Sequence, residues 1–184
     1  MKKEEILAEA LAKILAHTGA LSPAVAEQVA FLFKDAAQEY FTDFLLEEGF
    51  VEKRDLLEAL SVHYQVPWFD VEGYFFDHML IHLFPKDFLL RNNIIPVEVD
   101  EDVLLVVAQD PSDSNLESGI GAYGSWDVQF NVGLKRDIND AAKEFADTPV
   151  TQVEEDQDSE AERRLIKEEE AIEERGDNPA KEED

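Results

Sequence analysis

The spacing of apolar residues changes along this chain, from a helical period in residues 1–66 to short β-branched runs after residue 93. In the first part, apolar residues recur every three or four positions, as they do on one face of an amphipathic helix. This spacing predicts helices over residues 6–15, 24–46 and 53–64. β-Branched runs favour strands instead. The order of the two patterns predicts an α+β fold, in which helices pack on a small sheet.

Capping residues mark where the predicted helices begin and end. Ser22 is a good N-cap residue, and Pro23 suits the first helical position. From there, residues 24–46 are expected to form one nearly unbroken helix, which Gly49 terminates. Pro67 prevents continuation of the helix that begins at Lys53.

The N-terminal part contains an internal repeat. Residues 15–21 (LAHTGAL) align with residues 45–51 (LLEEGFV), and the aligned glycines, Gly19 and Gly49, are 49 − 19 = 30 residues apart. Each copy consists of a helix, a glycine-containing turn and a second helix, which predicts two repeated helical hairpins. Two unrelated hairpins with similar turns would produce the same pattern, and both interpretations stay open.

The C-terminal part combines short helices with three strands. Residues 94–99 and 103–108 are apolar runs separated by an acidic turn at residues 100–102, which indicates a β-hairpin. Apolar and polar residues alternate over residues 128–132 and predict a third strand with one buried face. The helices expected around these strands cover residues 77–83, 86–91, 116–122 and 137–145.

Acidic residues are concentrated in a C-terminal tail. Residues 150–184 contain 15 Asp and Glu against 5 Lys and Arg, so they carry 15 − 5 = 10 of the 27 excess negative charges. Such a segment has too few apolar residues to offset the entropy lost on folding, although residues 159–175 could form a solvated helix. We therefore expect a helical subdomain over 1–66, a small α+β subdomain over 67–147 with a three-stranded sheet, and a disordered or helical acidic tail over 148–184.

The net charge of −27 and the absence of cysteine limit the function classes. Nucleic-acid binding depends on Lys and Arg that neutralise phosphates, and an acidic protein is repelled by anionic membranes. Basic protein partners are favoured, although the charge can equally serve solubility alone. No apolar stretch is long enough to span a bilayer or to form a secretion signal. We expect a cytoplasmic protein without a nucleic-acid partner and without direct membrane insertion.

No motif in the sequence indicates an enzyme. Gly119, Gly121 and Gly124 spell G-x-G-x-x-G, but they close a predicted helix and precede a strand, whereas a dinucleotide fold requires the opposite order. A glycine-rich helix end is the favoured interpretation. His78 and His82 have the spacing of metal ligands but no third ligand nearby, which favours structural or surface roles. A Walker A motif, a G-x-S-x-G elbow and a cysteine nucleophile are absent from the sequence. We predict no catalytic residues and no metal site.

Several ordered segments resemble the N-terminal domain of the ATPases that drive type II secretion and type IV pilus assembly. The first is residues 44–71, with a leucine pair, a glycine and a leucine-rich helix that runs into ALSVHYQVPWFDV. LFP at residues 83–85, NIIPV at residues 93–97 and LLVVAQDP at residues 104–111 follow in the family's order. With the helix at 137–145, the resemblance covers about residues 10–145. It implies a non-catalytic regulatory or docking module.

In one branch of this family, tandem motifs of the form RLGxxLLxxGLLxxxxLxxxLxxQ bind cyclic di-GMP. The resemblance places Tyr40 at the Arg position, Thr42 at the Gly position and His63 at the Gln position of the second repeat. The positions that would line the nucleotide are Leu45, Leu46, Gly49, Leu56 and Leu60. The three contact positions of the first repeat hold Ala10, Ala12 and Phe33.

Both copies of the motif have therefore lost their polar contact residues. A dianionic ligand without an Arg partner meets unfavourable electrostatics on an acidic protein. Cyclic di-GMP sensing by a remodelled site, in which Tyr40 or His63 stacks on a base, remains the alternative hypothesis. No other cofactor is expected.

Another branch of the family uses the same fold to dock the cytoplasmic part of an inner-membrane platform protein. That role requires surface rather than polar ligands, so docking of a protein partner of a secretion or pilus system is the leading hypothesis. The predicted docking face is aromatic and contains Trp68, Phe69, Tyr74, Phe75 and Phe76, for which core packing is the alternative. The chain is expected to be either a stand-alone relative or the front end of a longer ATPase.

Overall fold

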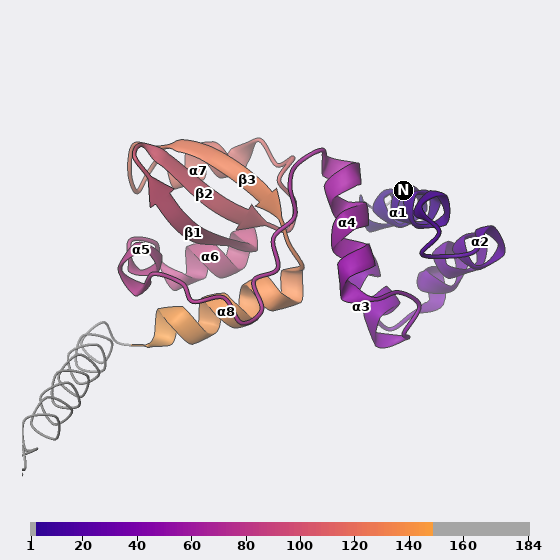
Figure 1. Ribbon diagram of the computed structural model, residues 1–184. Helices are drawn as coiled ribbons and strands as arrows, with labels where there is room; N and C mark the ends of the chain where they lie inside the picture. Colours follow the sequence, from indigo (N-terminus) through magenta and orange to yellow (C-terminus); the bar gives the residue numbers. More distant parts are fainter. Residues whose placement is uncertain (1–2, 149–184) are drawn as a thin grey trace, which may run out of the picture. The chain divides into compact units, whose positions relative to one another are not determined.

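The computed structural model describes residues 3–148, and the predicted acidic tail beyond residue 148 lies outside the described residues. Residues 3–148 form eight α-helices, one short 3-10 helix and a three-stranded sheet (Figure 1). The predicted α+β class is confirmed. Of these, residues 3–147 belong to one compact unit that extends to Asp147. The division of the chain into parts over 1–66, 67–147 and 148–184 stays a prediction.

The N-terminal half is a set of helices around an apolar core. Its elements are α1 (Lys3–Thr18), α2 (Pro23–Leu32), the 3-10 helix η1 (Phe33–Asp35), α3 (Phe41–Glu47) and α4 (Lys53–Tyr64). α1 packs against α2, α3 and α4, and its Leu11 and Leu15 are fully buried. As predicted, Ser22 caps α2, because its Oγ accepts a hydrogen bond from the Val25 N–H at 3.3 Å. Pro23 is the first helical residue.

The two glycine turns confirm the predicted pair of helical hairpins. Gly19 follows α1 with φ +82°, and Gly49 follows α3 with φ +71°, both in the left-handed region that favours glycine. The carbonyl of Leu15 and, at the aligned position, that of Leu45 each accept the backbone N–H that closes the turn, at 3.0 and 2.9 Å. The two copies therefore share both a turn glycine and an acceptor carbonyl.

The single helix predicted over residues 24–46 is wrong. α2 ends at Leu32, η1 follows, and residues 36–40 are not helical before α3 begins. The break brings the ring centroids of Phe33 and Phe41 to 5.2 Å. On a continuous helix the same residues would lie about 12 Å apart along the axis. Burial of these two rings against Phe44 outweighs the local preference for one helix, and this tertiary effect is invisible in the spacing of apolar residues.

The C-terminal half is a small three-stranded sheet packed by helices, as predicted, and the sheet is mixed. Its elements are α5 (His78–His82), α6 (Lys86–Asn92), β1 (Ile94–Asp100), β2 (Val103–Ala108), α7 (Asn115–Ile120), β3 (Asp127–Val132) and α8 (Lys135–Asp147). The strand order is β1-β2-β3, with β1 and β2 antiparallel across the acidic turn and β2 and β3 parallel. α7 lies in the connection between the parallel strands. α8 packs against α5, α6, β1 and β2.

The segment after α4 joins the helical half to the sheet. The Phe69 N–H donates to the Val132 carbonyl at 2.9 Å, and the Val132 N–H donates to the Pro67 carbonyl at 2.9 Å. Val132 and Leu134 are buried in the apolar core of the helical half. The end of β3 therefore belongs to both halves, which sets the position of α4 against the sheet.

The G-x-G-x-x-G sequence is a helix end, as predicted. Gly121 is the C-cap residue of α7. A Cβ atom on Gly119 would lie 3.2 Å from the ring of Phe88, and one on Gly124 would lie 2.3 Å from the ring of Trp126. These two glycines are therefore required for close packing of aromatic rings.

Replacing either turn glycine by alanine should destabilise the protein. A Cβ on Gly19 or Gly49 meets no atom within 4 Å, so the cost comes from the left-handed backbone alone. We expect Gly49→Ala and Gly19→Ala each to lower the free energy of unfolding by about 1 kcal/mol. Urea unfolding followed by circular dichroism measures this loss.

Gly121→Ala is the matched control. Gly121 has φ −60°, and an added Cβ would make an ordinary contact at 3.4 Å with the Glu117 carbonyl. The free energy of unfolding should change by less than about 0.5 kcal/mol. An equal loss at Gly121 and Gly49 would contradict the explanation from backbone conformation.

Candidate functional site

A pocket of about 390 Å³ contains two of the positions that sequence reasoning assigned to a ligand, Tyr40 and His63. We call it the Tyr40–His63 pocket. The residues that line it come from α1, from the N-cap of α3, from the ends of α4 and α6, from the loop after β2 and from α7. They are Lys3, Glu4, Ile6, Leu7, Tyr40, His63, Tyr64, Arg91, Asn92, Asn93, Gln109, Asp110, Ser112, Asp113 and Leu116. The fold thus brings together parts of the chain that are far apart in sequence.

Asp110 is the central acid of this pocket. It forms an ion pair with Lys3 and accepts a hydrogen bond from the Ser112 Oγ at 2.5 Å. Burial alone would raise the pKa of Asp110, but the bonds from Lys3 and Ser112 outweigh burial and lower it. Asp110 is therefore a carboxylate at neutral pH. Burial, with Asp110 and Glu4 nearby, raises the pKa of the Tyr64 hydroxyl, which remains a neutral hydrogen-bonding group.

The ring of Tyr40 lies against a lysine side chain. The Lys135 Nζ lies 3.4 Å from the centroid of the Tyr40 ring, a cation–π contact. Tyr40 occupies the N-cap position of α3 without a capping hydrogen bond from its side chain. Glu4 takes over this role, because its Oε2 accepts a hydrogen bond from the Phe41 N–H at 3.2 Å. Burial raises the pKa of Glu4 against the opposing effect of this bond. One face of the Tyr40 ring is therefore already in use.

The other ligand positions from the sequence lie in different surroundings. Thr42, Leu45, Leu56 and Leu60 are buried in the core of the helical half. Leu46 packs against that core, and Gly49 is the exposed turn glycine. None of these six residues lines the Tyr40–His63 pocket. Their role in ligand binding stays a prediction.

Arg91 and Gln109 line the same pocket but carried no signal in the motif comparison. Arg91 is exposed and makes no ion pair within residues 3–148. The repeat motifs have no Arg at their contact positions, and Arg91 brings a guanidinium to the pocket from α6, outside both repeats. Asp110 was visible in the sequence only as part of the LLVVAQDP segment.

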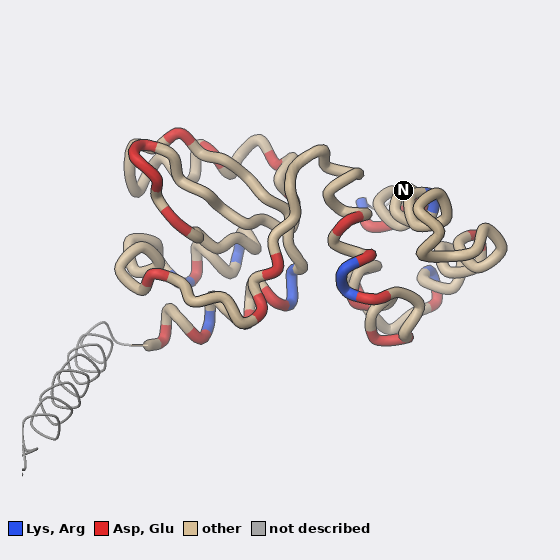
Figure 2. Tube along the Cα trace, viewed as in Figure 1, with Lys and Arg blue, Asp and Glu red and all other residues tan. Residues whose placement is uncertain are grey.

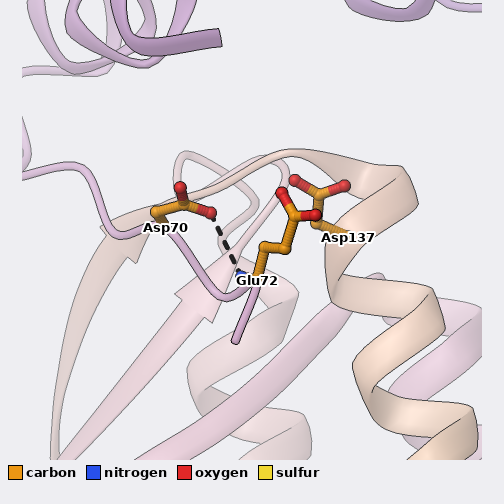
Figure 3. Close-up of side chains that lie close together, drawn as sticks. All are labelled: Asp70, Glu72 and Asp137. Carbon is orange, nitrogen blue, oxygen red and sulfur yellow. Dashed lines mark hydrogen bonds between the residues drawn. The ribbon is translucent and has the colours of Figure 1, made fainter. Parts of the chain in front are cut away.

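A second charged cluster surrounds Lys53 at the start of α4. The Lys53 Nζ lies 2.8 Å from Asp70 Oδ1, 2.6 Å from Glu72 Oε2 and 2.7 Å from Asp137 Oδ2. Figure 3 shows the three carboxylates converging, with the Glu72 N–H donating to Asp70. Burial opposes the charge on Lys53, but the hydrogen bonds that its ammonium donates to the three carboxylates outweigh burial and raise the pKa of Lys53.

The Lys53 cluster has the donor set of a cation site. One oxygen from each carboxylate lies within 4.8 Å of the others, and such oxygens suit Ca²⁺ or Mg²⁺. The Lys53 ammonium lies within ion-pair distance of all three and neutralises part of their charge. The arrangement therefore ties α4 to residues 70–72 and to α8.

His78 and His82 lie on α5 in structural surroundings. The His82 Nδ1 lies 2.7 Å from the His78 carbonyl oxygen, and the His78 ring packs 4.9 Å from the Phe145 ring. A ring nitrogen of His82 is thus already used within the helix. The interpretation of both as structural or surface residues agrees with these contacts.

The predicted aromatic docking face is mostly core. Phe69, Tyr74 and Phe76 form a chain of edge-to-face ring contacts at 5.1 and 4.8 Å. Only Trp68, at 37%, and Phe75, at 92%, have exposed side chains. Core packing therefore explains three of the five aromatic residues.

Phe75 lies close in the chain to two other exposed apolar residues. Met79 on α5 is 61% exposed, and Leu83, the C-cap residue of α5, is 51% exposed and follows Met79 by about one helical turn. We call Phe75, Met79 and Leu83 the α5 patch.

Comparison with known proteins identifies the second half of the described chain. Residues 64–152 match the family model of the MshEN domain. This domain is the non-catalytic N-terminal part of type II secretion and type IV pilus assembly ATPases, which confirms the resemblance found in the sequence. A search of curated protein sequences finds no match.

Solved structures share the fold of the MshEN domain and of the helices before it. A structure of MshE with cdg (cyclic di-GMP) has a TM-score of 0.57 and 20% identity, over 73% of this chain and 97% of that one. The N-terminal domain of XpsE has a TM-score of 0.50 and 18% identity, over 78% of this chain and 96% of that one. At these identities the likeness concerns the fold. Among the described helices, none has the length and apolar character needed to cross a membrane.

Removing the Lys53 ammonium should destabilise the protein and create a cation site. In Lys53→Met, three carboxylates face one another, and Asp137 keeps only its 3.6 Å contact with Arg136. We expect the free energy of unfolding at pH 7 to fall by about 2 kcal/mol. Millimolar Ca²⁺ should raise the melting temperature of the variant and leave that of the wild type unchanged. Calorimetry with and without Ca²⁺ measures both effects.

Two further measurements test the role of Lys53: the dependence of stability on pH, and a variant of the neighbouring Arg54–Glu58 ion pair. The pKa of Lys53 is higher in the folded protein than in the unfolded chain. Its contribution to the free energy of unfolding is therefore complete below about pH 10 and is lost as the pH rises through the folded-state pKa. Arg54 pairs with Glu58 at 3.0 Å on the surface, so Arg54→Met should cost less than about 0.5 kcal/mol. Equal losses for the two variants would contradict a structural role of the Lys53 cluster.

Proposed function

We propose that this chain is a non-catalytic interaction module that docks a protein partner of a secretion or pilus assembly system in the cytoplasm. The observation that carries the proposal is the α5 patch, in which Phe75 is 92% exposed and is followed within eight residues by the exposed Met79 and Leu83. Exposed aromatic and Met side chains are enriched at interfaces, where a few such residues supply most of the binding energy. The relation to the N-terminal domains of secretion ATPases supports this choice of partner.

The α5 patch is presented by a well-anchored helix. The Asp77 Oδ1 caps α5 by accepting hydrogen bonds from the N–H groups of Met79 and Leu80, at 2.8 and 3.4 Å. Leu80 and Ile81 are buried in the core under the sheet. Because Leu80 and Ile81 fix α5 by packing, the backbone that carries Met79 loses little conformational freedom when a partner binds.

The charge of the protein favours a basic partner surface. The chain carries 43 Asp and Glu against 16 Lys and Arg, and acidic residues occur on both halves of the described part (Figure 2). A basic patch on the partner would speed association, and salt would slow it. The cytoplasmic part of an inner-membrane platform protein, which the family resemblance implies, is the partner that we propose.

Docking through the α5 patch can be tested with one exposed aromatic residue. We expect Phe75→Ser to weaken binding of the purified cytoplasmic part of the platform protein by about tenfold or more, because it removes the largest exposed apolar side chain. Titration calorimetry with wild-type and variant chains measures the effect.

Phe31→Ser is the matched control, because Phe31 is the other strongly exposed phenylalanine in residues 3–148, at 66%. It should leave the affinity for the platform protein unchanged. Equal affinities for the wild type and Phe75→Ser would contradict docking through the α5 patch.

Cyclic di-GMP sensing is a second candidate, favoured by one observation. Tyr40 and His63, from separate helices, line one pocket together with Arg91. MshE, which shares the fold, was determined with cdg. Three acids of the same pocket, Glu4, Asp110 and Asp113, oppose a dianionic ligand, and Lys135 covers one face of Tyr40.

The two candidates differ in their response to cyclic di-GMP. We expect no calorimetric signal from the native protein up to about 100 μM ligand. Tyr40→Arg/His63→Gln should gain measurable binding, since a guanidinium forms bidentate hydrogen bonds with phosphate. Tyr123→Arg/His82→Gln makes the same changes outside the pocket and should gain nothing. Micromolar binding by the native protein would favour sensing over docking.

A further inference from the structure

A second cavity lies between α1 and α2, away from the Tyr40–His63 pocket and the α5 patch. It is an apolar groove of about 450 Å³, which we call the α1–α2 groove. Its floor contains the buried Ala12 and Ala26, at 4% and 6% exposure. The residues that line it are Glu9, Ala12, Lys13, Ala16, Pro23, Ala26, Glu27, Ala30, Phe31 and Lys34. The short side chains leave a depression that is large enough for an aromatic side chain from another molecule.

A large apolar side chain stands beside this depression. Phe31 lines the groove and is 66% exposed, and the adjacent Leu32 is 49% exposed. Both lie at the end of α2, so the helix holds them in place. The same surface therefore has an apolar side chain that projects, Phe31, and an apolar groove beside it. A surface with both features is complementary to itself under a two-fold axis.

The charges of the groove distinguish it from the rest of the protein. Residues 1–149 carry 17 excess negative charges, which is the total of 27 minus the 10 of the tail. Asp and Glu occur along both halves of the trace (Figure 2), so the net charges of two copies of such a protein repel one another.

The groove itself is neutral. Glu9 and Lys13 on α1, and Glu27 on α2 with Lys34 just after it, sum to zero charge. None of these four side chains forms an ion pair within residues 3–148, so all four remain available to a second molecule.

We propose that the α1–α2 groove is a homodimer interface, in which Phe31 of each copy enters the groove of the other. Each helix brings a negative and a positive side chain to this surface, so an isologous dimer pairs acids with bases in both directions. A basic partner would gain nothing here, because the surface has no net charge. Burial of two Phe31 rings supplies the apolar gain that offsets the loss of freedom on association.

Sedimentation velocity of the full chain at about 0.15 M salt, where charge repulsion is screened beyond about 8 Å, tests this proposal. The wild type should show a monomer–dimer equilibrium that depends on concentration. Phe31→Ser should raise the dissociation constant by about tenfold or more, and Phe75→Ser should leave it unchanged. A wild type that stays monomeric, or a dimer that Phe31→Ser does not weaken, would overturn the proposal.

The absence of cysteine from the chain permits a direct test of the contact surface. Ala30→Cys places one thiol in the groove, and Ser118→Cys places one on the exposed surface of α7. With a short bis-maleimide reagent, Ala30→Cys should form a covalent dimer in much higher yield than Ser118→Cys. Equal yields would overturn the assignment of this groove as the interface. The outcome is independent of docking through the α5 patch, because the two surfaces share no residue.

Discussion

Backbone pairing between residues 67–69 and the end of β3 connects the helical half to the sheet. Val132 donates to the Pro67 carbonyl and accepts from the Phe69 N–H, while its side chain is buried in the helical core. The Lys53 cluster adds an ionic link from α4 to residues 70–72 and α8. The Tyr40–His63 pocket depends on these links, because its walls come from both halves. A shift of α4 against the sheet would move His63 away from Arg91 and Asp110.

Three of the basic residues of this acidic protein lie at contacts between distant segments. Lys53 bridges three carboxylates, Lys3 pairs with Asp110, and Lys135 lies on the Tyr40 ring. In each case the cation lies between segments that are distant in sequence, so it offsets repulsion that folding itself creates. Most of the other acids in residues 3–148 are exposed, and they repel other copies of the chain and anionic ligands. The protein surfaces available for association are therefore those with little net charge or with exposed apolar residues.

Three surfaces remain distinct in what they can bind. The Tyr40–His63 pocket is polar and contains more acids than bases. The α5 patch is apolar, and α5 is anchored by the buried Leu80 and Ile81. The α1–α2 groove is apolar and neutral, with an exposed phenylalanine at its edge. The MshEN fold thus supports several kinds of contact, and the residues on each surface decide which one is favourable.

The sequence by itself determined the α+β class, the glycine turns of both hairpins, the β-hairpin with its acidic turn and the third strand. These features depend on local preferences: helical period, the conformational freedom of Gly19 and Gly49, and alternation of apolar residues. The tertiary structure alone decided the break after Leu32, because three phenylalanine rings pack together only if the helix ends. It also decided that Tyr40 and His63 share a pocket with Arg91, and that Lys53 meets three acids. Contacts between residues this far apart in the chain leave no period or spacing in the sequence, since only folding brings them together.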